Sequence, residues 1–334
     1  MLLQSLLQQT PNIMNMLIFA FLAVMLLLGV LGFVTYAILA ERKVMGFMQL
    51  RQGPSVTGGR YGLLQTVADV LKLLLKEDVI PKIADKPLFI LAPVITFVPA
   101  FVVLAVLPFT ENLGFADIGI ALLYYVAISG LSVIGIMIGG WASNNKYSLI
   151  GGMRAAAQMI SYEIPLVLSV IGVIMLSGSL NLTTIVEAQS DLWFVVYQPV
   201  AFFIFFTAAV AELNRVPFDL PEAESELVAG YHVEYSGFRF AFFMLAEYVY
   251  LFAMAALTTL IFLGGWHSLP FLSFIPGTIW FVLKFMLVVF VLLWIRFTFP
   301  RIRGDQLMEF AWKVLIPLAL ANIFITALIR GLFL

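Results

Sequence analysis

The chain contains no cysteine, only two histidines and few charged residues, and each shortage excludes a class of protein. Without cysteine there are no disulfides, no thiolate-held iron–sulfur clusters and no cysteine-bound zinc. The histidines, His232 and His267, fall in different loops, which argues against a haem held by two histidines. Charged residues make up 11% of the 334 residues, whereas a soluble domain has roughly 25%. We therefore exclude a soluble globule, a disordered chain and a nucleic-acid binder, and expect no redox centre on this chain.

Hydrophobic residues make up 63% of the sequence and gather in long runs. A helix needs about 20 mostly apolar residues to cross a bilayer, and eight runs are long enough. They show no period-two alternation and are too long for barrel strands, so we expect helices. The predicted spans are Met14–Ala40, Leu88–Leu107, Ile118–Ala142, Ala155–Leu176, Leu192–Ala211, Phe240–Leu263, Thr278–Phe297 and Phe310–Ile329.

Positive charges predict the orientation of these spans. The loops after the first, third, fifth and seventh spans contain Lys and Arg, whereas the alternate loops contain none. Positively charged loops stay in the cytoplasm, so both termini are expected outside. The predicted fold is an all-α integral membrane protein with a single membrane domain over 1–334. It comprises an interfacial segment at 1–11 and two large cytoplasmic loops, 41–86 and 212–238, with short amphipathic helices.

The first cytoplasmic loop contains a predicted amphipathic helix over Tyr61–Glu77. Its apolar residues Leu64, Val67, Leu71 and Leu74 fall on one helical face, but the segment is too short to span a membrane. One interpretation is a helix that anchors the loop on the membrane surface. The other is a basic mouth that positions a partner or a lipid-soluble substrate, and composition alone leaves both open.

The second cytoplasmic loop is rich in carboxylates. Asp219 and Glu222 have the spacing of a helix-capping box, and acids suit the first turn of a helix. If 220–230 is helical, Asp219, Glu222 and Glu226 share a face, whereas Glu224 points away. A solvated acidic face and a functional cluster are both compatible with this pattern.

Three more glutamates lie within or at the end of predicted spans. Glu163 is in the fourth, two residues before Pro165, Glu212 closes the fifth, and Glu247 is in the sixth. Ionisable groups in a bilayer are costly and usually face a bundle interior or a water-filled path. A snorkelling glutamate, or a Glu–Lys pair formed with Lys284 or Lys313, would be a structural alternative. Together with the acidic loop, these glutamates favour proton transfer.

Several longer motifs extend this interpretation. They are Glu41–Gly46, Gly62–Gln65, Lys72–Glu77, Gly140–Tyr147, Arg154–Pro165, Glu212–Arg215, Glu234–Gly237 and Pro300–Met308. In this order the sequence resembles the family of H subunits of bacterial NADH:quinone oxidoreductase, respiratory complex I, whose mitochondrial counterpart is NADH dehydrogenase subunit 1. Two positions depart from the usual family pattern: Phe47 stands where an arginine is usual, and Ser55 where an asparagine is usual.

The resemblance implies a membrane subunit that encloses a tunnel for quinone and links quinone reduction to proton translocation. It implies that the isolated chain has no activity, that quinone is the substrate, and that FMN and iron–sulfur clusters lie in partner subunits. Those partners are peripheral-arm subunits at the quinone site, small membrane subunits and antiporter-like subunits, in a bacterial cytoplasmic membrane.

The same resemblance implies roles for particular residues. The proton-transfer residues would be Glu163, Glu212, Asp219, Glu222, Glu224, Glu226 and Glu247, and the quinone-tunnel residues Arg42, Arg51, Asp69, Arg215 and Phe218. The rival interpretations are the equivalent subunit of a membrane-bound hydrogenase and a stand-alone ion transporter. The sequence shows no inverted repeat of the kind many transporters carry.

Overall fold

A computed structural model describes residues 13–111, 113–222, 224–268 and 274–333 of the chain. The described residues form helices and loops, with one isolated β-bridge between Thr110 and Leu113, so the predicted all-α class is confirmed. The interfacial segment predicted at 1–11 lies outside the described residues. The long helices are α2 (Ile13–Met48), α4 (Lys86–Val102), α5 (Ala121–Ala142), α6 (Lys146–Ser177), α9 (Pro199–Glu212), α11 (Gly237–Phe262), α12 (Gly277–Thr298) and α14 (Ile316–Phe333).

Short helices connect or extend these. They are α3 (Gln65–Leu75), η1 (Val103–Val106), α7 (Leu182–Glu187), α8 (Phe194–Tyr197), α10 (Glu224–Leu227), η2 (Gly230–His232), α13 (Gly304–Glu309) and the π-helical turn η3 (Phe310–Leu315). The helix α13 runs through η3 into α14, so the last predicted span is continuous from Gly304.

Within the described part of the chain, seven helical segments are long and apolar enough to cross a membrane. They correspond to seven of the eight predicted spans. The remaining prediction, Leu192–Ala211, forms α8 and the 14-residue α9. The break falls at Gln198, because Pro199 disfavours a helical conformation in the residue before it. The helix α9 is apolar but short, so a total of eight spans stays a prediction.

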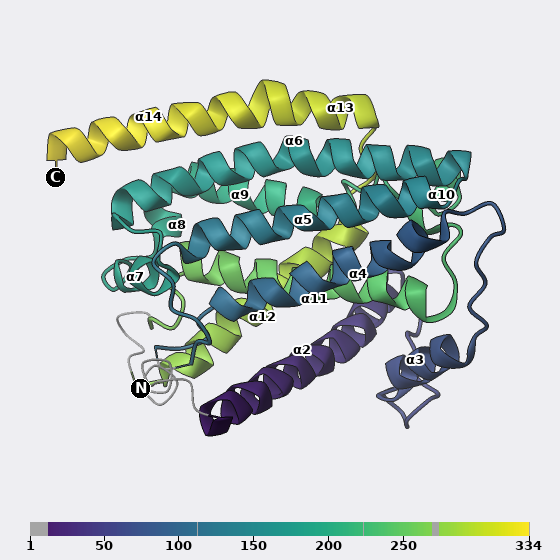
Figure 1. The fold of residues 1–334 in the computed structure, drawn as a ribbon. Coiled ribbons are helices and arrows are strands. Elements are labelled where there is room, and N and C mark those ends of the chain that lie inside the picture. The colour runs from purple at the N-terminus through teal and green to yellow at the C-terminus, as the bar shows by residue number, and fades with distance from the viewer. Residues whose placement is uncertain (1–12, 112, 223, 269–273, 334) are drawn as a thin grey trace.

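The helices pack as a layered bundle (Figure 1). Contacts run from α2 to α11, then to α4, α5 and α6, while α9 packs on another side of α6. The yellow α13–α14 segment lies along α6 at the edge of the bundle opposite α2. The helix α11 lies in the middle and contacts α2, α3, α4 and α12. Its C-terminal half is almost entirely buried, so α11 is the central helix of the core.

Two helix boundaries differ from the sequence predictions. The helix α2 continues to Met48, so Glu41 is a buried helical residue and not the start of a loop. The helix α6 begins at Lys146, where the Asn145 side chain caps it, and not at Ala155, so Glu163 lies near its midpoint. Hydropathy locates the apolar part of a helix, whereas the helix itself continues until a cap or turn ends it.

The second loop contains far less helix than the sequence suggests. Of the residues that the structure describes in this loop, Glu224–Leu227 and Gly230–His232 are helical, so a continuous helix over 220–230 does not form. Asp219 instead pairs with Arg301, at 2.9 Å between Oδ2 and Nη2. The Asp219 carboxylate thus forms a long-range ion pair and does not cap a local helix.

Two glycines attach this loop to α6. A Cβ at Gly151 would lie 2.7 Å from Gly230 Cα, so the helix and the loop touch backbone to backbone. Gly230 has φ +57°, and a Cβ there would lie 1.7 Å from the carbonyl oxygen of Pro221. Only glycine fits this turn. The contact places Tyr231 and His232 beside the N-terminal part of α6.

Candidate functional site: a buried network of carboxylates and guanidinium groups

A small polar cavity lies where α9 ends and near the start of α11. Its volume is about 40 Å³, and its walls include Glu212 from α9, Glu222 from the second loop and Glu247 from α11. A bound water needs about 10–15 Å³ of such volume and two to four polar partners. The cavity therefore has room and hydrogen-bonding groups for a few waters between three of the predicted proton-transfer residues.

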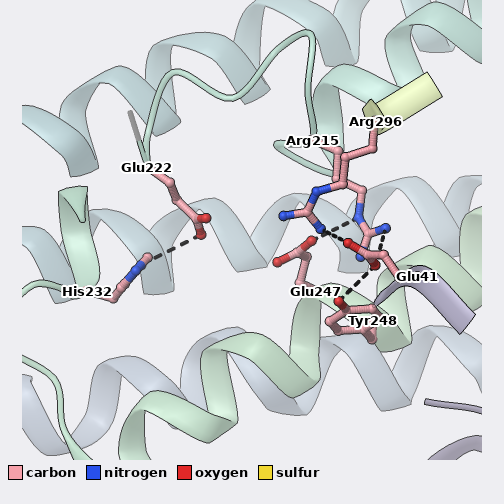
Figure 2. Close-up of polar contacts among 7 residues, drawn as sticks. All are labelled: Glu41, Arg215, Glu222, His232, Glu247, Tyr248 and Arg296. Atoms are coloured by element: carbon pink, nitrogen blue, oxygen red, sulfur yellow. Dashed lines mark hydrogen bonds and ion pairs between the residues drawn. The ribbon is translucent and has the colours of Figure 1, made fainter. Parts of the chain in front are cut away.

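Beside this cavity, two arginines and two glutamates form a network of ion pairs (Figure 2). Arg215 contacts both acids, with 2.9 Å between its Nε and Glu247 Oε1 and 3.3 Å between its Nη1 and Glu41 Oε2. Arg296 also pairs with Glu41. The Tyr248 hydroxyl donates a hydrogen bond to Glu41 Oε2 at 2.9 Å. The network joins α2, the loop after α9, α11 and α12.

This network is buried at Arg215 and Glu41, partly exposed at Glu247 and Arg296, and balanced in charge. The side chains of Arg215 and Glu41 are 2% and 8% exposed. Burial opposes the charge of Arg215, but the Glu247 and Glu41 carboxylates outweigh it and raise the pKa of its guanidinium. The Tyr248 ring, 4.7 Å from Arg215 Cζ, adds a cation–π contact. The two positive and two negative charges of the network cancel. Gain or loss of a proton here therefore leaves a net charge that neighbouring groups must stabilise.

Glu222 lines the polar cavity from the second loop. Burial, together with the nearby Glu247 and Asp219 carboxylates, raises the pKa of Glu222 to about 8. At neutral pH this carboxyl group therefore holds a proton, and a modest change in local charge would release it. Burial and the nearby Glu222 carboxyl group raise the pKa of the Tyr231 hydroxyl. His232 Nδ1 lies 3.7 Å from Glu222 Oε1 (Figure 2).

Glu212 and Glu163 lie near the same cavity. One carboxylate oxygen of Glu212 is buried without a hydrogen-bond partner in the described structure, and Glu163 interacts with Glu212 electrostatically. The Glu163 carboxylate rests against α5 at Gly130, where an added Cβ would lie 3.1 Å from its Oε1. These two carboxylates extend the set of acids toward the middle of the bundle.

The other acids of the second loop lie apart from the cavity. The Glu226 carboxylate is exposed and pairs with Arg154 at 2.6 Å, and Arg154 lowers the pKa of Glu226. Asp219 is held by Arg301, although burial raises the pKa of Asp219. The side chain of Glu224 lies outside the described structure. The structure thus brings together Glu212, Glu222 and Glu247.

A second cavity, of about 350 Å³, is lined almost entirely by apolar side chains. It lies where α2, α3, α4 and α11 meet, and the lining includes Val34, Ile38, Val70, Phe97 and Ala241. Most of the polar groups at its edge are hydroxyls, so it suits an apolar molecule and not an ion.

None of the predicted tunnel residues is in the described lining of this apolar cavity, but Asp69 directly precedes Val70, which is. Arg42, one helical turn beyond Ile38, pairs with Asp69 of α3 at 2.6 Å. Arg51 lies farther out, where it donates to Gln49 and lines an open basic hollow with Lys43 and Arg60. Arg215 and Phe218 do not line the apolar cavity. Arg215 is in the ion-pair network, and Phe218 is buried against Tyr162.

Comparison with known proteins identifies the family that the sequence motifs resemble, over nearly the whole chain. Residues 21–327 match the family model described as NADH dehydrogenase. The chain belongs to this family. It is 74% identical over 332 residues to the H subunit of the NADH-quinone oxidoreductase of Anoxybacillus flavithermus, and 72% and 71% identical to proteins of the same name in a Geobacillus species and Bacillus thuringiensis. Each comparison covers 99% of this chain and 100% of the relative.

Sequence reasoning misses three residues of the site: Glu41, Arg296 and His232. In the sequence, Glu41 and Arg296 look like charges that flank spans, whereas Tyr248 is compatible both with a hydrogen-bonded chain and with an interfacial tyrosine. His232 enters the sequence analysis only as a haem ligand that is excluded. The one available signal is that Glu41 directly follows an apolar run with no turn residue between them. Glu41 and Arg296 are 255 residues apart in the sequence, so their pairing needs the fold.

Proposed function

We propose that this chain is the quinone-admitting, proton-coupling membrane subunit of a proton-pumping NADH:quinone oxidoreductase. The observation that carries the proposal is the cavity in which Glu212, Glu222 and Glu247 meet beside a neutral network of ion pairs. Clustered carboxylates in the interior of a membrane protein are typical of proton pathways. The full-length similarity to proteins named as H subunits of NADH-quinone oxidoreductase supports the same assignment.

Quinone admission is assigned to the apolar cavity between α2, α3, α4 and α11. Quinones carry long apolar tails, and this cavity offers an apolar surface beside an amphipathic helix. The apolar residues Leu64, Val67, Leu71 and Leu74 are exposed, in or next to α3, which suits a helix that lies on a membrane or on a partner subunit. The Arg42–Asp69 pair joins α2 to α3 and keeps the two walls together.

Proton coupling is assigned to the polar cavity. Reduction of a quinone places charge on its head group or takes up protons, and either changes the local potential. Carboxyl groups that share a small, poorly solvated cavity respond strongly to such a change. In the proposal, protons then move among Glu222, Glu212, Glu247 and Glu163, and the arginines absorb part of the change in charge.

Electron transfer in this proposal needs other subunits. FMN and iron–sulfur clusters belong in peripheral-arm subunits, and the chain itself receives quinone. Small membrane subunits and antiporter-like subunits are its neighbours within the membrane. The proposed location is a bacterial cytoplasmic membrane, with the C-terminal end of α2, which contains Arg42, and the loop that contains Arg215 on the cytoplasmic side.

Purification of the tagged chain in a mild detergent tests the assignment. We expect partner subunits, flavin, iron–sulfur clusters and NADH-dependent quinone reduction in the eluate. Nickel without NADH activity would assign the chain to a hydrogenase. An active lone chain would assign it to a transporter, and either result would overturn the proposal.

Glu163→Gln is expected to reduce coupled turnover without preventing assembly. The amide keeps the size of the side chain against Gly130 but cannot exchange protons. We expect NADH:quinone turnover to fall by at least about tenfold, while the amount of assembled complex, measured by bound FMN, changes little. Normal proton pumping in this variant would contradict a role for Glu163.

Ala241→Trp is expected to obstruct the apolar cavity. The indole would fill part of the 350 Å³ space between α11, α2 and α4. We expect a higher KM for a quinone with a long isoprenoid tail and a smaller change for a short-tailed analogue. Val282→Trp, on the exposed face of α12, is a control with a similar increase in size. Equal effects of both variants on both quinones would rule out this cavity as the quinone path.

A further inference from the structure

No hydrogen bond of its Nδ1 explains why His232 lies buried beside Glu222. His232 is 9% exposed, and its Nδ1 is buried without a hydrogen-bond partner in the described structure. A buried nitrogen left unpaired costs about 1–3 kcal/mol of stability, so such a group needs another explanation. In Figure 2 the Nδ1 of His232 points toward the Glu222 carboxyl group, 3.7 Å from Oε1.

The backbone holds this geometry in place. The turn η2 contacts α6 at the Gly151–Gly230 approach. The imidazole ring packs against Tyr231 and Phe240, with 5.0 and 5.3 Å between ring centroids. A short movement of either side chain brings Nδ1 within hydrogen-bonding distance of Glu222. The His232 side chain is 10% exposed, so a small part of it can meet water, while its Nδ1 faces Glu222, which lines the polar cavity.

We propose that His232 is the proton-transfer partner of Glu222, carrying protons between the cytoplasmic surface and the polar cavity. This inference rests on the proposed function. In the inward direction, the imidazole takes up a proton from water to form imidazolium and passes the proton on Nδ1 to the Glu222 carboxylate. The products are neutral imidazole and the protonated carboxyl group, and the reverse steps release a proton.

Burial also controls when this step occurs. It lowers the pKa of His232 to about 4, whereas that of Glu222 is raised to about 8. At rest the ring is neutral and the carboxyl group is protonated, so the pair does not leak protons. A positive charge added to the cavity favours loss of the proton from Glu222, and a negative charge favours protonation of His232.

The surroundings of the pair contain few other groups that titrate near neutral pH. The helix α5, which packs against η2, contains no charged residue. The charged or titratable groups on the loop, on the cytoplasmic half of α6 and on the facing part of α11 are Arg215, Asp219, Glu222, Glu224, Glu226, Tyr231, Glu234, Tyr235, Lys146, Tyr147, Arg154, Arg239 and Glu247. Arg154 and Glu226 neutralise each other, and Asn145 binds Glu234.

The test uses the assembled complex in proteoliposomes, with rates expressed per bound FMN. We expect His232→Asn and His232→Gln to reduce NADH-driven quinone reduction by at least about tenfold. The residual rate should fall with rising pH more steeply than in the wild type, because protons must then reach Glu222 without a relay. Phe240→Leu, which alters the packing of the ring but keeps the imidazole, should retain the wild-type pH profile.

A double variant separates this inference from the proposed function. If the two residues act as one unit, adding His232→Asn to Glu222→Gln should cause no further loss. Wild-type rates and pH profile in both His232 variants, or losses that multiply in the double variant, would overturn the inference. Normal pumping in Glu222→Gln alone would instead overturn the proton-coupling function.

Discussion

Arg215→Met is expected to abolish both assembly and activity, the largest loss of any single substitution proposed for this chain. The change leaves Glu41 and Glu247 as two buried acids with only Arg296 to neutralise them. Removing one partner of a buried ion pair costs about 3–5 kcal/mol, a large part of the roughly 5–15 kcal/mol by which a typical domain is stable. We expect little assembled complex and no measurable coupled turnover.

A compensating change distinguishes loss of charge balance from loss of a single contact. Adding Glu247→Gln to Arg215→Met leaves one acid, Glu41, paired with one base, Arg296. We expect assembly, measured by bound FMN in purified membranes, to recover, but proton pumping to stay low because Glu247 lines the polar cavity. Assembly that is as poor in the double variant as in Arg215→Met would contradict the charge-balance argument.

Glu222→Gln is expected to assemble well and still lose proton pumping. At neutral pH the Glu222 carboxyl group is protonated because its pKa is raised to about 8, and glutamine closely matches that neutral form. The amide cannot release a proton, so coupled turnover should fall by about 100-fold, the lower range for loss of a proton-transfer group. Proton release in proteoliposomes, per NADH oxidised, measures the effect.

The pH dependence of stability provides an independent check on Glu222. Its pKa is raised in the folded chain above the ordinary value in the unfolded chain, so the folded state binds this proton more tightly. The contribution of this proton to stability is therefore fully present below the ordinary pKa, falls as pH rises toward about 8, and is lost above that. We expect the Tm of the purified complex to fall less with rising pH in Glu222→Gln than in the wild type.

Glu226→Gln is the matched comparison on the same loop. Its carboxylate is exposed and pairs with Arg154 away from the polar cavity, and exposed pairs contribute little to stability. We expect a much smaller loss of pumping and an unchanged pH dependence of Tm. Equal losses at both positions would mean that the whole acidic loop, and not the cavity, carries the effect.

The sequence is sufficient to predict the membrane class, seven of the spans and the acids inside them. Long apolar runs and single carboxylates within them are local signals, and these signals alone identify Glu163 and Glu247. These local signals do not predict the short α9. The apolar run at Leu192–Ala211 is long enough, but Pro199 divides the helix within it.

The ion-pair network could not be predicted in the same way. Its members come from α2, the second loop, α11 and α12, and local sequence contains no information about which charges meet. Glu41 looks like the first residue of a loop because Arg42 and Lys43 follow it, yet the helix continues and buries its carboxylate. Asp219 fits a capping box, yet Arg301 takes its carboxylate in the fold.

Infrared difference spectroscopy of the complete complex tests whether quinone reduction changes the protonation of the carboxyl groups that line the polar cavity. Spectra are compared before and after NADH reduces bound quinone, in the wild type, Glu222→Gln and Glu226→Gln. We expect a carbonyl band of a protonated carboxyl group that changes in the wild type and Glu226→Gln and is absent in Glu222→Gln. An identical band in all three proteins would contradict this expectation.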